Sequence, residues 1–132
     1  LGSQYWAKNP HVPGYRARYG ILLDMVGVPN ATFPKEQHSM YYAPHVVQKV
    51  WNEATANGFD SFFVNKQGGG ITDDHLPINQ IIGIPTIDII HYDENGFGDF
   101  WHTQNDTMEN IDKTTLTAVG QTLLGVIYKE KE

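Results

Sequence analysis

The chain carries a nearly continuous apolar stretch, Tyr19-Gly20-Ile21-Leu22-Leu23-Asp24-Met25-Val26-Gly27. Such a run, in which polar and apolar residues do not alternate, is typical of a strand buried on both faces. Strands of this kind belong to parallel sheets, whose two faces are covered by helices. A second run of the same character follows later, at Pro85-Thr86-Ile87-Asp88-Ile89-Ile90. The two runs predict buried strands of a mostly parallel sheet.

Amphipathic segments that predict helices lie around these runs. Apolar residues recur every three or four positions in residues 43–57, and Gly58 follows as a typical helix stop. A last helix is expected at residues 113–128, with Asp112 as its N-cap. Its expected apolar face consists of Leu116, Val119, Leu123, Leu124 and Ile127.

The remaining segments complete an alternating order of strands and helices. They are expected to be the end of a helix at residues 1–8, a strand at 61–64, a short helix at 76–82, and loops at 28–40 and 91–110. The predicted fold is therefore α/β, with a mostly parallel sheet and flanking helices.

Length and composition exclude several classes of function. The chain has 132 residues, enough for one domain, and no cysteine, which excludes disulfides and thiolate metal sites. A net charge of −6 and the absence of a basic stripe argue against a nucleic-acid partner. No apolar run approaches the roughly 18 residues of a membrane span. Because the sequence opens at Leu1 rather than at methionine, we expect a fragment or processed form.

Asp24 is the most informative single residue. It lies inside the first apolar run, where a buried carboxylate is costly unless it is paired or binds a metal. Open α/β sheets bind their ligands beyond the carboxyl ends of strands, so this position suits a functional group. A structural carboxylate with a satisfied ion pair is the alternative.

Two further polar clusters are expected near strand ends. Asp73-Asp74-His75 follows a glycine-rich loop, and neighbouring carboxylates push their pKa values apart, which suits proton transfer or metal orientation. Asp74 alone is expected to cap the following helix instead. Trp101-His102 lies in the loop after the second apolar run; a lone loop histidine is more often a solvated surface residue.

Taken in order, these clusters resemble the C-terminal half of the zinc exopeptidase superfamily that includes bacterial aminopeptidases, and most closely its glutaminyl cyclase branch. The resemblance is carried by Leu22-Leu23-Asp24-Met25-Val26-Gly27, Pro29-Asn30-Ala31-Thr32-Phe33-Pro34, Asp73-Asp74-His75-Leu76-Pro77, Gly83-Ile84-Pro85 and Trp101-His102-Thr103 with Asp106, Glu109-Asn110 and Asp112. It covers nearly the whole chain.

The resemblance implies a substrate pocket and a zinc ligand. His102 would bind zinc through one imidazole nitrogen. Trp101 would line the pocket and orient the side-chain amide of the substrate, and Phe97 would be a second pocket aromatic. Thr72 occupies a substrate-contact position that is often Gln in cyclases.

The resemblance also implies roles for two carboxylates. Asp73 would belong to a hydrogen-bond network close to a catalytic glutamate. Asp24 would join that network in a one-zinc cyclase, or bind a second metal in a two-zinc aminopeptidase. The family's other zinc ligands and its general acid/base glutamate would precede Leu1. Residues 1–132 would then be the C-terminal part of a single catalytic domain, truncated on its N-terminal side, with uncovered sheet edges that favour self-association.

The expected function is zinc-dependent conversion of the N-terminal Gln of peptides to pyroglutamate, with release of ammonia. A zinc aminopeptidase that removes N-terminal residues is the alternative, and a non-catalytic binding module with the same fold is a third. In either enzyme the partners would be the N-termini of peptides or proteins. The family's usual setting implies an extracytoplasmic location, periplasmic or secreted.

Overall fold

The computed structural model describes residues 2–131, and its strands form two parallel pairs. β1 (Gly20–Asp24) pairs with β4 (Thr86–Ile90), and β2 (Phe33–Lys35) pairs with β3 (Phe63–Gln67). Both pairs are parallel, which confirms the α/β fold expected from the two apolar runs.

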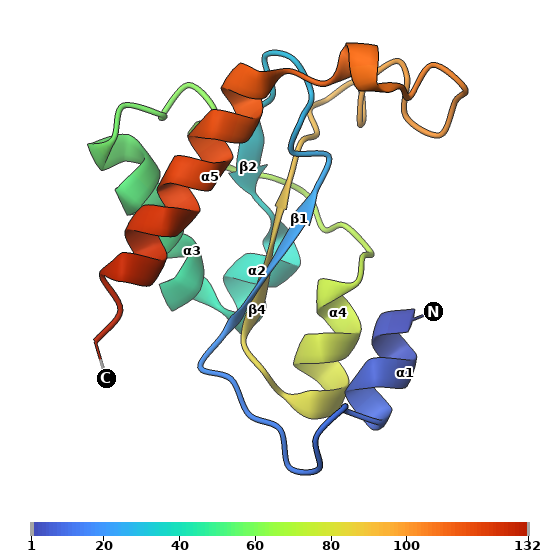
Figure 1. The fold of residues 1–132 in the computed structure, drawn as a ribbon, viewed down its shortest axis with the longest axis vertical. Helices are drawn as coiled ribbons and strands as arrows, with labels where there is room; N and C mark the ends of the chain where they lie inside the picture. The colour runs from blue at the N-terminus through green and yellow to red at the C-terminus, as the bar shows by residue number, and fades with distance from the viewer. Residues whose placement is uncertain (1, 132) are drawn as a thin grey trace.

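Helices lie to either side of the strands. They are α1 (Gly2–Lys8), α2 (Gln37–Tyr42), α3 (Pro44–Ala56), α4 (His75–Pro77) with a π turn at Ile78–Ile82, and α5 (Lys113–Tyr128), besides a 3-10 turn at Met108–Asn110. In Figure 1, α3 and α5 lie together on one side of β1 and β4, and α1 and α4 lie together on the other. The helix expected at residues 1–8 is α1, although Leu1 lies outside the described residues.

Two expectations about local structure are wrong. Residues 28–40 contain β2 and α2 rather than only a loop. α2 begins where it does because Glu36 is its N-cap, with a side chain that accepts hydrogen bonds from the backbone N–H groups of His38 and Ser39.

The second wrong expectation concerns β1, which is not buried on both faces. Leu23 is 43% exposed, whereas every residue of β4 is buried. Among residues 2–131, β1 pairs with β4 alone, so its other edge stays open.

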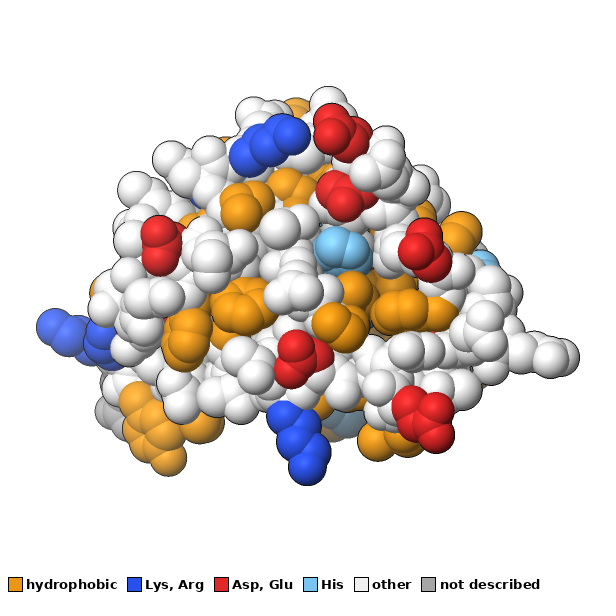
Figure 2. All heavy atoms as spheres, turned by 90° about the horizontal axis from the view of Figure 1, so that it is seen from above, with side chains coloured by type: hydrophobic (Ala, Val, Ile, Leu, Met, Phe, Trp, Pro, Cys, Tyr) orange, Lys and Arg blue, Asp and Glu red, His pale blue; other side chains and the backbone are white. Residues whose placement is uncertain are grey.

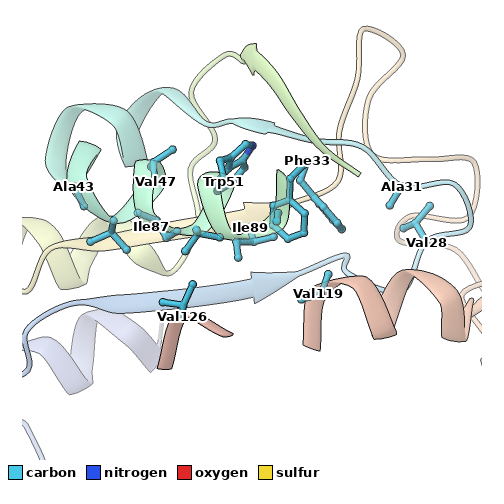
Figure 3. Packing of buried hydrophobic residues seen from close by; sticks show 14 residues of the cluster. Val28, Ala31, Phe33, Ala43, Val47, Trp51, Ile87, Ile89, Val119 and Val126 are labelled. Atoms are coloured by element: carbon cyan, nitrogen blue, oxygen red, sulfur yellow. The ribbon is translucent and has the colours of Figure 1, made fainter. Parts of the chain in front are cut away.

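The hydrophobic core lies between α3, α5 and the strands. Figure 3 shows side chains of α3, β2, β4 and α5 converging on one interior, with Phe33 and Trp51 at its centre. The Phe33 and Phe63 rings pack at a centroid distance of 5.2 Å. This core fixes β4 and hence the position of β1 beside it.

The apolar face expected for α5 is right only in part. Val119 is buried and Leu123 packs against the core, as expected, whereas Leu116, Leu124 and Ile127 are exposed. The other buried residues are Thr115, Ala118, Thr122 and Val126. The two threonines can be buried because each hydroxyl donates to a backbone carbonyl, Thr115 to Val28 and Thr122 to Ala118, both at 2.8 Å. Small residues also permit close packing: a Cβ at Gly125 would meet the Glu53 side chain of α3 at 2.2 Å.

Phe33→Ala should lower the free energy of unfolding by about 3–5 kcal/mol, because the lost ring leaves a cavity among fully buried neighbours. Urea unfolding measures the change. Tyr41→Ala is the matched control, since Tyr41 is 78% exposed and should change stability by less than about 0.5 kcal/mol. Equal effects of the two substitutions would contradict this description of the core.

Candidate active site

The residues expected to carry the chemistry line one cavity of about 440 Å³. Its lining contains all six of the residues singled out from the sequence: Asp24, Thr72, Asp73, Phe97, Trp101 and His102. Gly70, Ile71 and Ile90 complete it. Segments far apart in the sequence therefore meet at one place.

The parallel strands explain why these residues meet. Asp24 is the last residue of β1 and Ile90 is the last residue of β4, so the cavity lies at the carboxyl ends of both strands. Met25 then adopts a left-handed backbone, φ +53°, and turns the chain away directly after Asp24. Figure 2 looks onto this end of the molecule, where acidic side chains and a histidine lie among exposed hydrophobic ones.

The loop after β4 supplies an aromatic wall. The Phe97 and Trp101 rings lie 4.8 Å apart between centroids, and the Trp101 and His102 rings stack at 3.9 Å with an interplanar angle of 19°. His102 has a φ of +56°, which a residue with a Cβ adopts only at a cost of roughly 1–2 kcal/mol. Backbone strain of this kind is concentrated at functional sites. The loop thus holds the imidazole beside the indole at the rim of the cavity.

Asp24 and Asp73 form one carboxylate pair in the cavity. Asp24 is exposed, not buried as its place in the apolar run predicted. Partial desolvation nevertheless raises its pKa, and the neighbouring Asp73 carboxyl raises it further. Oδ1 of Asp73 accepts a hydrogen bond from the backbone N–H of Asp74 at 2.7 Å. Raised carboxyl pKa values in a cavity are typical of sites that hold or transfer protons.

The expected capping role of Asp74 is wrong. Its backbone is already helical, with φ −61° and ψ −20°, so its side chain is not placed to cap α4. Instead its Oδ1 accepts a hydrogen bond from the Ser3 hydroxyl at 2.6 Å, which ties α1 to the start of α4.

The sequence analysis missed a buried acid–histidine pair behind the cavity. Nε2 of His75 lies 2.9 Å from Oε1 of Glu36, and both side chains are fully buried. Burial alone would raise the pKa of Glu36. The bonds from His75 and from the backbone N–H groups of His38, Ser39 and Ile71 outweigh it and lower that pKa to about 2. No pattern in the sequence pointed to Glu36, because glutamate is an unusual N-cap residue.

Asp88 was also missed, although a signal existed. It interrupts the apolar run of β4 just as Asp24 interrupts that of β1, and the same burial argument applies to it. The register pairs Leu22 with Asp88 and Asp24 with Ile90, so the two aspartates lie on the same face of neighbouring strands. Burial raises the pKa of Asp88 to about 9, and the Asp73 carboxyl adds to this effect.

His102, Asp24 and Asp73 are the side chains of the cavity with the chemistry of zinc ligands, one imidazole and two carboxylates, and the family resemblance assigns zinc binding to His102 and, in an aminopeptidase, to Asp24. Within residues 2–131, however, no group of three or more His, Cys, Asp or Glu side chains is close enough to hold a metal ion. The donor set fits zinc in kind, and this part of the chain supplies at most two of the three protein ligands that a catalytic zinc has.

Comparisons with family profiles, curated proteins and solved structures agree on the family to which this chain is similar. The profile of Peptidase family M28 matches residues 1–127. The glutaminyl-peptide cyclotransferase of Bos taurus is 30% identical over 138 residues, which cover 89% of this chain and 36% of that protein.

Two solved structures are more similar to this chain than the Bos taurus protein is. A Bacteroides thetaiotaomicron glutaminyl cyclase bound to N-acetylhistamine has a TM-score of 0.97 and 56% identity over 99% of this chain and 45% of its own. A Zn-dependent exopeptidase from Parabacteroides distasonis has a TM-score of 0.95 and 56% identity, over 98% and 46%. The chain spans about a third of the curated relative and less than half of these structures. The match over residues 1–127 means that this chain belongs to peptidase family M28.

Proposed function

We propose that residues 1–132 form the C-terminal part of a single catalytic domain of a zinc-dependent glutaminyl-peptide cyclotransferase. The observation that carries this proposal is the cavity, whose lining combines an aromatic wall and a histidine with two neighbouring aspartates. Similarity to glutaminyl cyclases over nearly the whole chain supports it.

In the proposed reaction, the α-amine of an N-terminal Gln attacks the side-chain carbonyl carbon of the same residue. A five-membered ring closes as the new C–N bond forms, and the side-chain nitrogen leaves as ammonia after taking up a proton. Zinc, when bound, would polarise that carbonyl as a Lewis acid. His102 would hold the metal at the rim of the cavity.

The chain's own residues would prepare the substrate for ring closure. Trp101 and Phe97 form a wall that orients the amide and excludes water, whose attack would hydrolyse it instead. Thr72 lies in the same lining and would contact the substrate. Asp73 and Asp24 would fix the geometry and protonation of the general acid/base, which the family resemblance places outside this chain.

The second candidate is a zinc aminopeptidase, favoured by the similarity to a Zn-dependent exopeptidase. Asp24 would then bind a second metal. Similarity to glutaminyl cyclases among both the curated relatives and the solved structures favours the cyclase.

We further propose that the protein acts outside the cytoplasm on the N-termini of peptides. The described residues contain no helix long and apolar enough to cross a membrane. Cell fractionation, with activity found in the periplasm or medium, tests this proposal.

The proposed reaction predicts the outcome of one mass-spectrometric assay. The full-length protein, incubated in zinc-containing buffer with one peptide that begins with Gln and one that begins with Leu, should remove ammonia from the first and leave the second intact. Loss of the N-terminal residue from the Leu peptide would establish the aminopeptidase instead. Survival of both peptides would contradict both enzymes and favour a binding module.

The incomplete ligand set predicts that residues 1–132 alone bind zinc with a Kd weaker than about 1 μM, because they supply at most two of three protein ligands. Calorimetric titration of the isolated segment, with its folding checked by circular dichroism, measures this. His102→Ala should weaken the residual binding further. Micromolar or tighter binding would show that the ligand set described above is incomplete.

A further inference from the structure

Four buried polar atoms gather behind Asp73 without a hydrogen-bond partner. Across the part of the chain that the structure describes, these are the buried side-chain atoms left unpaired: Oδ2 of Asp73, Nδ1 of His75, and Oδ1 and Oδ2 of Asp88. Leaving buried polar atoms unpaired is costly, so four at one place require an explanation.

A hydrogen on Asp88 would give two of the four atoms a partner. The Asp73 carboxyl lies close enough to Asp88 to raise its pKa, and two carboxyls share a hydrogen bond only when one of them carries a hydrogen. One hydrogen on Asp88, directed at Asp73, meets that requirement. Nδ1 of His75 lies 3.7 Å from Oδ2 of Asp88, which is longer than a hydrogen bond.

The surroundings decide which acid keeps the proton. Glu36 accepts hydrogen bonds from backbone N–H groups and from His75. Asp73 accepts one hydrogen bond, from the backbone N–H of Asp74. Each of these bonds stabilises an ionised carboxylate. Asp88 is fully buried and receives no such bond. Burial, followed by the Asp73, Asp24 and Glu36 carboxyls, raises its pKa to about 9.

We propose that Asp88 is a positioning residue of the site: a neutral carboxyl, seated on the His75–Glu36 pair, that donates its hydrogen to Asp73. Asp73 is then held ionised and in one orientation at the cavity. The proposal rests on the function proposed above, because Asp73 acts there through the general acid/base.

The groups that face Asp88 come from every element around it. Asp73 and His75 lie at the start of α4, Asp24 ends β1, and Glu36 caps α2. Tyr92 lies just beyond β4, and its own pKa is raised by burial and by the charges of Glu36 and Asp88. The charged groups that raise the pKa of Asp88 are three other acids, Asp73, Asp24 and Glu36, which favours retention of a proton on Asp88 at neutral pH.

The first test compares Asp88→Leu with Asp88→Asn in the full-length protein. Leucine is similar in size but cannot donate a hydrogen bond, so kcat for cyclisation should fall by about 100-fold. Asparagine keeps a donor N–H for Asp73, so it should recover kcat to within about tenfold of the natural protein. The natural protein should also lose activity above about pH 9, and Asp88→Asn should lack that loss.

The second test does not depend on the reaction. A carboxyl with a pKa of about 9 when folded, against 3.8 as its ordinary value, binds its proton more tightly in the folded state. Between these values, stability falls as the pH rises, because unfolding releases the proton. An asparagine does not titrate. The Tm of Asp88→Asn minus that of the natural protein, both freed of metal, should therefore grow by several degrees from pH 5 to pH 8.

The outcomes separate this proposal from the proposed function. A Tm difference independent of pH would show that Asp88 is ionised in the folded protein and overturn the proposal. Equal inactivity of folded Asp88→Asn and Asp88→Leu, or full activity of Asp88→Leu, would overturn it as well. If the natural protein cyclises no peptide, the proposed function fails, and the Tm comparison still decides the protonation of Asp88.

Discussion

Four carboxyl groups crowd together beside β1 and β4, two of them, Glu36 and Asp88, in contact with the buried His75, and the rest of the structure accommodates this crowding. The Asp73 carboxyl raises the pKa of both Asp24 and Asp88, and the Asp24 and Glu36 carboxyls raise that of Asp88 further. Buried charges are costly unless they are paired, so the two fully buried acids, Glu36 and Asp88, each need a donor or a proton. The N-terminus of α2 supplies donors to Glu36, and the turn into α4 supplies one to Asp73.

The same crowding links the fold to the proposed chemistry. The parallel register sets Asp24 and Asp88 on one face of neighbouring strands, and Asp73 lies in contact with both. The loop after β4 then places Trp101 and His102 in the lining of the same cavity as Asp24 and Asp73. The cavity thus combines acids suited to hold protons with aromatic and imidazole side chains suited to hold an apolar or amide group and a metal.

Much of this arrangement could be predicted from the sequence. Apolar runs are strong signals, so they predicted β1, β4, α3 and α5. The position of Asp24 within such a run pointed to the correct end of the sheet, although Asp24 itself is exposed rather than buried. Asp88 was open to the same argument and was overlooked. The exposure of Leu23 could not be predicted, because it depends on which strands flank β1. Glu36 and His75 meet across 39 positions of sequence, a distance that no local pattern spans.

The protonation of Asp88 is the most direct measure of this account. Infrared spectra of the full-length protein with isotopically labelled aspartate, recorded at pH 7, distinguish a carboxylic acid from a carboxylate by the carbonyl stretch. The account predicts a carboxylic acid band that is present in the natural protein and absent from Asp88→Asn. A spectrum at pH 7 in which every aspartate is ionised would contradict it.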